Sequence, residues 1–260
     1  MLLGGCASVP AADFTFALLG DTPYSAGEAK RLDRLIDDLN AEPLELVVHL
    51  GDLGAARDAC SDAWLDARKA QLARIRSPVV MVPGDNEWTD CRDQTGRLAA
   101  WRKRFCTAPF AAEVQRGEYC EHRRWRAAGL LFVTLNVPGS NNNARHPQEM
   151  AQRMAAALTW LDESAELARH HKLTLVVLMQ ADPFVTSPRD GYADLRGRFR
   201  QLGKEMPGRV VLGHGDTHVW QDNEPWPGVH RLEVWGSPFV CFVRGDAERG
   251  AIAFSAPRCR

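Results

Sequence analysis

Five short polar turns recur along this chain, and each comes directly after a short apolar run. The runs are rich in Val, Leu and Phe and are too short for helices: Phe14–Leu19, Leu44–Leu50, Val79–Val82, Leu173–Met179 and Val210–Leu212. Such runs are typical of buried strands. The turns that follow them are GDTPYS, GDLG, PGDNE, MQADP and HGDTH. The sequence therefore predicts five strands, each ending in a polar turn.

Longer segments between these runs have apolar residues at helical spacing. Leu32, Leu35, Ile36 and Leu39 form one such set, and Met150 to Ala168 contains another. Strands and helices alternate, which indicates an α/β layered fold. Ligands of such folds bind beyond the carboxyl ends of the strands, where loops from several strands meet. All five polar turns begin there, so we expect them to form one site.

Charge alone constrains what this site contains. Two carboxylates about 5 Å apart repel by roughly 3 kcal/mol at an effective dielectric constant near 20. The converging turns carry the carboxylates of Asp21, Asp52, Asp85 and Asp216, beside the imidazole of His218. A shared proton would relieve one pair of acids. One or two divalent cations satisfy the whole group more simply, so a metal site is the favoured interpretation.

The order of these motifs resembles the calcineurin-like metallophosphoesterase superfamily, and the resemblance spans nearly the whole chain. It implies two β-sheets packed as a sandwich and flanked by helices, in one domain over residues 13–260. It also implies hydrolysis of phosphate mono- or diesters by a water that a dinuclear metal site activates. By similarity, Asp21 and His218 would bind one metal, Asp52 would bridge, and Asp85, Gln180 and Asp216 would bind the other.

The chain departs from the family pattern at several ligand positions. Pro23 stands where the first motif usually has histidine, and Asp85 replaces an asparagine. Gln180 and Asp216 replace two further histidines. A chain that had lost its metal would be expected to lose buried acids, because unpaired charge is costly, yet here acids are added. Mostly oxygen ligands favour Mn²⁺, Mg²⁺ or Ca²⁺ over zinc or iron, with one or two ions per chain.

The proton donor for the leaving group is the weakest part of the resemblance. Asn86 replaces the histidine that usually assists the leaving group; an amide can donate a hydrogen bond but cannot deliver a proton. His214 is the nearby histidine for that catalytic role, although a residue at a strand end that caps a turn fits its position equally well. Glu87 either orients a ligand or hydrogen-bonds the turn, and we favour the first.

A polar loop follows a further apolar run at Phe132–Leu135. Its side chains either meet substrate or reflect ordinary turn chemistry, and they include Asn141, Asn142, Asn143, Arg145 and His146. The formal net charge is −1, so basic clusters such as Arg102–Arg104 give no sustained positive face. We expect a small phosphorylated substrate and no nucleic acid. The competing class is a non-catalytic, cation-stabilised binding protein of the cell envelope.

The first twelve residues read as a remnant of an export signal or a disordered tether. MLLGGCAS resembles the end of a bacterial lipoprotein signal, in which Cys6 would carry a lipid anchor, although a chance GGC explains it too. Past this start, no apolar stretch approaches the roughly 20 residues needed to span a bilayer. We expect a periplasmic or membrane-anchored lipoprotein.

Six further cysteines support export: Cys60, Cys91, Cys106, Cys120, Cys241 and Cys259. An even set without close CxxC spacing indicates disulfides rather than a zinc knuckle. The sequence does not choose among the pairings. Local pairs among the first four would brace the loop after Asp85, whereas in a cytosol the same residues would be small, reduced core fillers.

Overall fold

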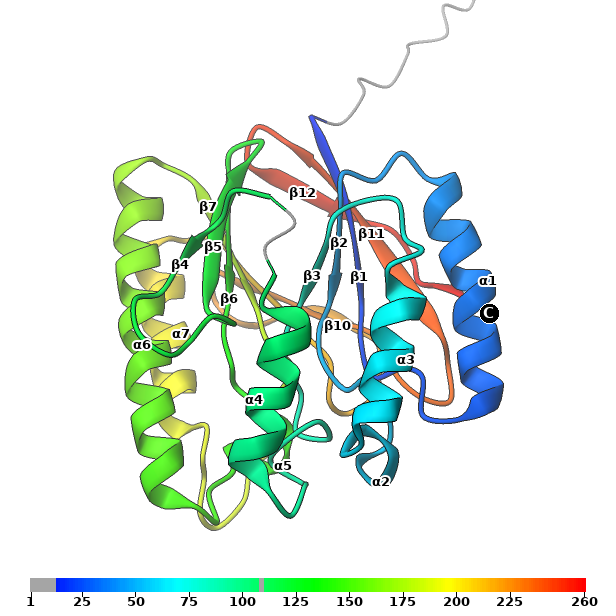
Figure 1. Cartoon of the computed structure of the whole chain (residues 1–260). Coiled ribbons are helices and arrows are strands. Elements are labelled where there is room, and N and C mark those ends of the chain that lie inside the picture. The colour runs from blue at the N-terminus through cyan, green and yellow to red at the C-terminus, as the bar shows by residue number, and fades with distance from the viewer. Residues whose placement is uncertain (1–12, 108–109) are drawn as a thin grey trace, which may run out of the picture.

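Two mixed β-sheets pack face to face between two layers of helices in the computed structural model, which describes residues 13–107 and 110–260 (Figure 1). The first sheet has the strand order β12-β11-β1-β2-β3, with β13 paired to β11. Its strands are β1 (Phe14–Leu19), β2 (Leu46–His49), β3 (Val79–Met81), β11 (Cys241–Glu248), β12 (Ala251–Phe254) and β13 (Arg258–Cys259).

The second sheet has the order β4-β5-β6-β7-β8-β10-β9. Its strands are β4 (Glu113–Val114), β5 (Arg123–Ala127), β6 (Leu130–Thr134), β7 (Thr174–Leu178), β8 (Val210–His214), β9 (Gln221–Trp226) and β10 (Val229–Glu233). The helices of the outer layers are α1 (Ala26–Ala41), α3 (Asp62–Leu72), α4 (Gln94–Phe105), α6 (Pro147–His170) and α7 (Ala193–Glu205). Two short turns of helix, α2 (Ala56–Ala59) and α5 (Gly139–Asn142), lie at the lower end in Figure 1.

Three apolar layers hold these elements together. Strand β1 shows how: Phe16 and Leu18 face the second sheet, whereas Ala17 and Leu19 face the helices that cover the first sheet. The ring of Phe16 meets the ring of Phe132 edge-on across the middle layer, with centroids 5.2 Å apart. A third cluster packs α6 and α7 on the second sheet. A sheet buried on both faces needs near-continuous apolar strands, which explains the runs in the sequence.

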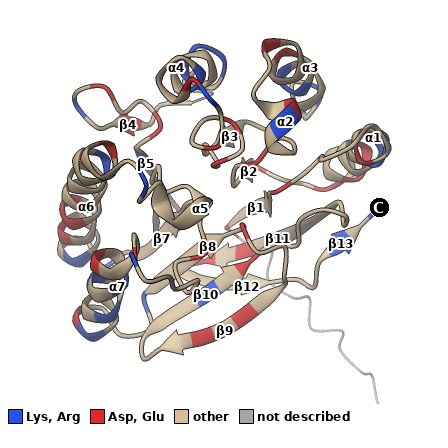
Figure 2. Cartoon of the chain, turned by 90° about the horizontal axis from the view of Figure 1, so that it is seen from below, with Lys and Arg blue, Asp and Glu red and all other residues tan. Residues whose placement is uncertain are grey.

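The predicted fold class is confirmed. Strand β1 has the predicted bounds, and the other four predicted strands differ from the structure by at most two residues at either end. The predicted helical segments lie in α1 and α6. The carboxyl ends of β1, β2 and β3, which run parallel, lie at the same end of the molecule as those of parallel β6, β7 and β8. Figure 2 views that end.

The predicted lipid-anchor residue, Cys6, lies outside the described residues. Within the described part of the chain, none of the helices has both the length and the apolar character needed to cross a bilayer.

Candidate metal centre

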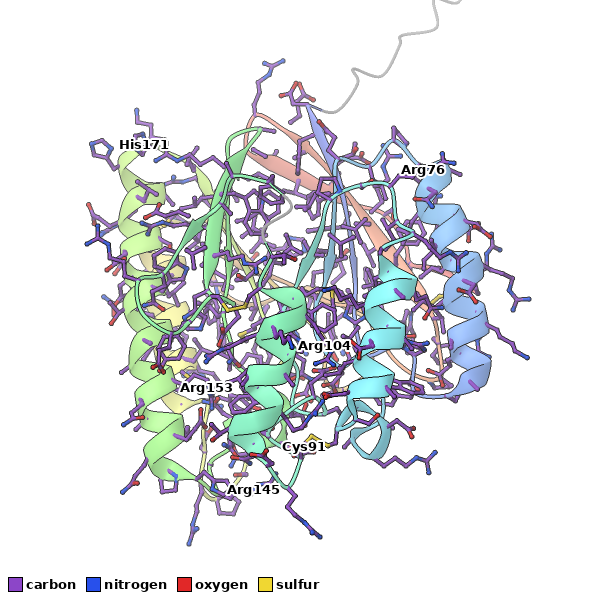
Figure 3. The ribbon with its side chains drawn as sticks, in the orientation of Figure 1. Arg76, Cys91, Arg104, Arg145, Arg153 and His171 are labelled. Atoms are coloured by element: carbon purple, nitrogen blue, oxygen red, sulfur yellow. A yellow bond between two sulfur atoms is a disulfide. The ribbon has the colours of Figure 1, made fainter. Side chains whose placement is uncertain are left out.

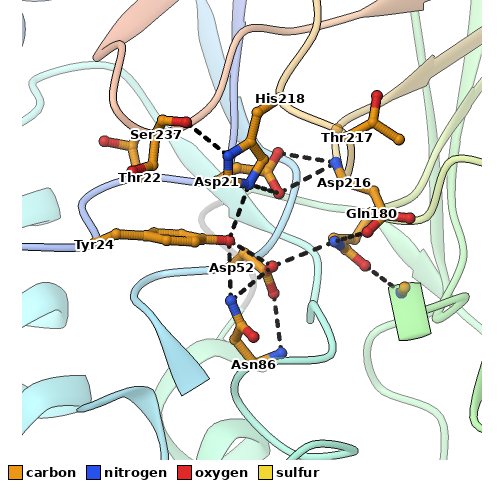
Figure 4. Close-up of polar contacts among 12 residues, drawn as sticks. Asp21, Thr22, Tyr24, Asp52, Asn86, Gln180, Asp216, Thr217, His218 and Ser237 are labelled. Atoms are coloured by element: carbon orange, nitrogen blue, oxygen red, sulfur yellow. Dashed lines mark hydrogen bonds and ion pairs between the residues drawn. The ribbon is translucent and has the colours of Figure 1, made fainter. Parts of the chain in front are cut away.

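The five polar turns converge between the ends of the two sheets. Asp21, Asp52 and Asp85 come from the first sheet, and Gln180 and Asp216 come from the second. The backbone N–H of Asp216 donates to both carboxylate oxygens of Asp21 at 3.1 Å. The Gln180 Nε2 atom lies 3.4 Å from both Asp52 Oδ2 and Asp216 Oδ1 (Figure 4). The sequence-predicted metal ligands therefore lie in one cluster.

Left-handed backbone conformations place several of these side chains. The φ angles are +50° at Asp21, +56° at Asp52, +85° at Asp216 and +61° at His218. Such conformations cost non-glycine residues on the order of 1 kcal/mol or more each and concentrate at functional sites. Buried Glu87 fixes the Asp52 turn, because its carboxylate accepts hydrogen bonds from the backbone N–H groups of Asp52, Leu53 and Gly84. Glu87 thus orients a predicted ligand through the backbone.

The carboxylates carry more negative charge than the protein around them neutralises. Burial, reinforced by neighbouring carboxylates, raises the pKa values of Asp21 and Asp52 well above their usual range. Burial and the nearby charge of Asp85 raise the pKa of Asp216 to about 7. Among the described residues, the ion pairs of these four aspartates include no Lys or Arg; His218 Nε2 lies 3.7 Å from Asp21 Oδ1. The cluster lacks a positive partner.

Two atoms in the cluster have the properties of metal ligands. The Nδ1–H group of His218 donates to the carbonyl oxygen of Ser237 at 2.7 Å. Burial lowers the pKa of His218, which favours the neutral ring with Nε2 facing the cluster beside the Tyr24 hydroxyl. Asp85 Oδ1 is buried without a hydrogen-bond donor. A Cβ atom on Gly139 would lie 2.7 Å from Asp85 Oδ1 and closer still to Asp216 Oδ1, so both oxygens face the same space. These residues fit a divalent cation.

Gln180 requires a correction. Its Oε1 atom accepts the backbone N–H of Gly139, which turns Nε2 toward the carboxylates. An amide nitrogen has no lone pair for a metal, so this orientation does not support the predicted ligand role. Gln180 instead donates hydrogen bonds that partly offset the charge of Asp52 and Asp216.

His214 also lies away from its predicted role as an acid. The side chain is fully buried, Nδ1 faces the carbonyl oxygen of Gly215 at 2.8 Å, and Nε2 accepts from Arg231 Nε at 2.9 Å. Burial and the charge of Arg231 lower the pKa of His214 to about 3. A neutral, enclosed ring has no proton to donate, so its position matches the structural alternative. Asn86 does reach the cluster, but its Nδ2 donates to Tyr24 and Asp52 at 2.9 and 3.0 Å.

The polar loop after β6 supplies a site residue that the sequence analysis missed. Ser140, Asn141, Asn142 and Asn143 all have positive φ angles, which makes α5 a left-handed turn. Ser140 Oγ donates to Asp85 Oδ2 at 2.7 Å. Arg145 lies at the outer end of this loop and contacts Asp90 (Figure 3). Four consecutive left-handed residues leave no trace in a hydrophobic pattern, although three adjacent asparagines are consistent with them.

Three disulfides join Cys60 to Cys91, Cys106 to Cys120 and Cys241 to Cys259. The sulfur atoms of Cys60 and Cys91 lie 3.8 and 3.5 Å from the carbonyl oxygen of Asn86, so this disulfide braces the loop after Asp85, as expected. Among the described residues, the one group of three acidic, histidine or cysteine ligand atoms within 4.8 Å of one another is Cys106, Cys120 and Glu121. Its sulfurs are oxidised, and Glu121 pairs with Arg102, so it is not a metal site.

In the candidate centre, no three ligand atoms of described aspartate and histidine residues lie within 4.8 Å of one another. These residues are linked by Gln180 and by the hydroxyl of Tyr24, which lies 2.7 Å from Asp52 Oδ2 and 3.3 Å from His218 Nε2. Neutral side chains therefore complete the cluster. Tyr24 belongs to the first polar turn, GDTPYS. A hydroxyl-bearing side chain in that turn was the one sign in the sequence that Tyr24 could reach the site.

The fold and this site define a metallophosphoesterase-like protein. The chain belongs to the calcineurin-like phosphoesterase family, whose sequence model matches residues 14–220. No curated protein matches the sequence.

Solved structures show the same fold at low sequence identity. A dimetal phosphatase from Danio rerio is 15% identical with a TM-score of 0.72, and the match covers 95% of this chain and 96% of that one. A purple acid phosphatase from yellow lupin is 14% identical with a TM-score of 0.59, over 94% of this chain and 52% of that one. GAP50, described as the anchor in the inner membrane complex of Plasmodium, is 13% identical with a TM-score of 0.53, over 96% and 90%.

Proposed function

We propose that this protein is a divalent-cation-dependent hydrolase of small phosphate mono- or diesters. Family membership supports metal-dependent phosphoester hydrolysis in general. The observation that carries the proposal is the cluster of Asp21, Asp52, Asp85 and Asp216, which lacks a Lys or Arg partner among the described residues and faces the Nε2 atom of His218. A divalent cation supplies Lewis-acid chemistry there: it lowers the pKa of a water and offsets charge on phosphoryl oxygens.

Mn²⁺, Mg²⁺ or Ca²⁺ is the proposed cofactor, because the candidate ligands are carboxylates with a single imidazole. Asp21, Asp52, Asp85, Asp216 and His218 would hold it. Two further residues orient these ligands: Glu87 fixes the Asp52 turn, and Ser140 donates a hydrogen bond to Asp85. Asn86 is partly exposed at the cluster, and its amide would have to leave Tyr24 or Asp52 to bind a phosphoryl oxygen.

The expected substrate is small rather than a nucleic acid. Three arginines of the basic clusters are paired with carboxylates: Arg102 with Glu121, Arg104 with Asp66 and Arg124 with Glu113. Beside the site lies an open depression of about 620 Å³, whose lining includes Arg92, Arg145 and His146 together with Asp90 and Asp93. This mixed lining suits a polar substrate portion remote from the reacting phosphate.

We also propose export to an oxidising compartment, in the periplasm or on the membrane as a lipoprotein. Three disulfides support this proposal, because such bonds persist where thiols are not kept reduced. Mass spectrometry of the amino-terminal peptide, from protein isolated with the membrane fraction of its host, tests for a lipid on Cys6. An unmodified Cys6 thiol in that peptide would contradict the anchor.

The competing function is a non-catalytic cation-stabilised binding protein. Two observations favour it: His214 is enclosed, and the Asn86 amide is engaged by Tyr24 and Asp52. Assays with aryl phosphate mono- and diesters under Mn²⁺, Mg²⁺, Ca²⁺ or Zn²⁺ separate the two. We expect turnover that EDTA abolishes and that Asp52→Asn lowers at least 100-fold, with exposed Asp37→Asn as the control. Cation uptake without turnover on any ester would support the binding protein.

A further inference from the structure

The hydroxyl of Tyr24 lies where three side chains of the candidate metal centre meet. Tyr24 Oη is 2.7 Å from Asp52 Oδ2, 2.9 Å from Asn86 Nδ2 and 3.3 Å from His218 Nε2 (Figure 4). The ring of Tyr24 also packs edge-on against the His218 imidazole, with centroids 5.1 Å apart. Neither the family pattern nor the polar spacing of the sequence assigns this residue a role.

Tyr24 connects two groups of the predicted ligands. Its hydroxyl oxygen lies beside Asp52 Oδ2 on one side and beside His218 Nε2 on the other. The Nδ1 atom of His218 is engaged by the carbonyl oxygen of Ser237, so Nε2 is the ring nitrogen that faces the cluster.

The distances suit two ligands of one cation. An octahedral ion with bonds of about 2.1 Å places adjacent ligand atoms roughly 3.0 Å apart. The separations here are 2.7 Å from Tyr24 Oη to Asp52 Oδ2, 3.3 Å from Tyr24 Oη to His218 Nε2, and 3.7 Å from that nitrogen to Asp21 Oδ1. The Tyr24 oxygen is therefore spaced from Asp52 Oδ2 and from His218 Nε2 as two ligands of one ion are spaced. The ligand atoms of Asp21, Asp52 and His218 do not all lie within 4.8 Å of one another, so Asp52 has to move closer when the ion binds.

We propose that Tyr24 is a metal ligand, which binds the cation shared by Asp21, Asp52 and His218 and takes over from the histidine that Pro23 replaces. The inference rests on the cation of the proposed function and adds a ligand to it. Because Pro23 stands in place of a histidine, the first turn lacks that nitrogen ligand. Tyr24, the next residue, places an oxygen atom in the same cluster.

Glu28 holds Tyr24 in this position. One carboxylate oxygen of Glu28 accepts the backbone N–H of Tyr24 at 2.8 Å, and the other accepts the hydroxyl of Ser237 at 3.1 Å. Ser237 in turn holds His218 through its carbonyl oxygen. The two proposed ligands, from opposite ends of the chain, are thus fixed to one carboxylate. Ligands held by such outer contacts bind metals more tightly because less ordering is required on binding.

Isothermal titration calorimetry with Mn²⁺ tests the proposal on wild-type protein, Tyr24→Phe and a control, Tyr119→Phe, whose ring stacks on His122 away from the site. We expect Tyr24→Phe to bind Mn²⁺ at least tenfold more weakly and Tyr119→Phe to match wild type. The visible absorption of bound Co²⁺ should change in Tyr24→Phe alone. Urea unfolding of the cation-free proteins establishes that each variant is folded.

Unchanged Mn²⁺ affinity and an unchanged Co²⁺ spectrum in Tyr24→Phe would overturn the proposal. Tighter binding, or an additional ion, would overturn it too, because the hydroxyl would then be blocking the ion. If wild-type protein takes up no cation, the proposed function itself fails, and the two failures are thereby distinguished.

A second measurement does not need Tyr24 to be altered. In wild-type protein labelled with 3-fluorotyrosine, the Tyr24 fluorine resonance is assigned by elimination with Tyr119→Phe and Tyr192→Phe. Addition of Mg²⁺ should shift that resonance and leave the Tyr119 resonance in place. A Tyr24 resonance that stays unmoved when Mg²⁺ is bound would overturn the proposal.

Discussion

Ser140 donates its hydroxyl proton to Asp85 Oδ2 at 2.7 Å from within a turn of four consecutive left-handed residues. Such a turn costs roughly 1 to 2 kcal/mol per residue, so contacts elsewhere must stabilise it. Tyr192 provides some of them: its hydroxyl donates to the carbonyl oxygen of Pro138 and accepts from the backbone N–H of Asn142. Contacts from Tyr192 thus stabilise the turn that holds Ser140 against Asp85.

Arg153 is the main charged support of this turn. It is 1% exposed, projects from α6 and donates to the side chain and the carbonyl oxygen of Asn142 at 2.6 and 3.1 Å (Figure 3). We expect Arg153→Met to lower the free energy of unfolding by about 3 kcal/mol, because partners of a buried charge are left unpaired. It should also weaken Mn²⁺ binding, because Ser140 loses its fixed position. Urea unfolding and calorimetry measure the two effects.

Arg169 on the same helix provides a matched control, because its side chain is 41% exposed and pairs with Glu166. Arg169→Met should change the free energy of unfolding by less than about 1 kcal/mol. Equal effects of the two substitutions would show that Arg153 contributes no more than a surface charge.

Asp85→Asn separates stability from cation binding. Asp85 adds charge to the cluster, and its Oδ1 atom has no donor. An asparagine oxygen still accepts the Ser140 hydroxyl, while the repulsion with nearby carboxylates is removed. We expect cation-free Asp85→Asn to be more stable than wild type by roughly 1 to 3 kcal/mol, yet to be stabilised less by Mn²⁺, because a neutral amide oxygen is a weaker ligand than a carboxylate. Differential scanning calorimetry with EDTA or Mn²⁺ provides both values.

Exposed Asp37→Asn controls for the loss of any one negative charge, since its side chain is 75% exposed. If Asp85→Asn destabilises the cation-free protein, or is stabilised by Mn²⁺ as much as wild type, Asp85 does not belong to the cation site.

The sequence predicted those parts of the fold that produce a regular pattern of apolar and polar residues. Buried strands such as β1 are apolar throughout, and the polar residue after each strand has its position fixed by topology, so the convergence of Asp21, Asp52 and Asp85 followed. Orientation was not predictable in the same way. Gln180 and His214 reach the expected region, but single backbone contacts turn the amide and enclose the imidazole.

The residues that sequence reasoning missed owe their positions to long-range contacts. Tyr24 reaches Asp52 and His218, which are 28 and 194 residues away along the chain. Ser140 reaches Asp85 because Tyr192 and Arg153, on other elements, fix its turn. Spacing within one turn contains no information about such partners.

Stability of the cation-free protein should fall as the pH rises from 6.5 to 8. Burial raises the pKa values of Asp216 and Glu87 to about 7, against about 4 in an unfolded chain. In this range the folded protein therefore holds protons that the unfolded chain has released, so the free energy of unfolding falls with pH. The buried histidines, with lowered pKa values, act in the opposite direction, because imidazoles in the unfolded chain lose their protons near pH 6.5, but this effect is confined to the lower end of the range.

Saturating Mn²⁺ should remove this loss, because the carboxylates then ionise against a cation. An ion present at 100 times its dissociation constant adds about 2.7 kcal/mol of stability. Thermal melts in EDTA and in Mn²⁺ at pH 6.5, 7.2 and 8 make the comparison. Stability that rises with pH in EDTA would contradict a cluster of buried, unneutralised acids.

The Cys60–Cys91 disulfide should affect cation binding, whereas Cys241–Cys259 should affect stability alone. The first, which includes Cys91 of Figure 3, lies against the carbonyl oxygen of Asn86, next to Asp85. The second joins β11 to β13 near the carboxyl terminus. Replacing either pair by serine removes a loop constraint worth about 3 kcal/mol. We expect comparable falls in the free energy of unfolding, but at least tenfold weaker Mn²⁺ binding only for the Cys60 and Cys91 double variant. Calorimetry below the melting temperature of both variants measures this difference, and equal Mn²⁺ affinities would show that the Asp85 loop keeps its conformation without the disulfide.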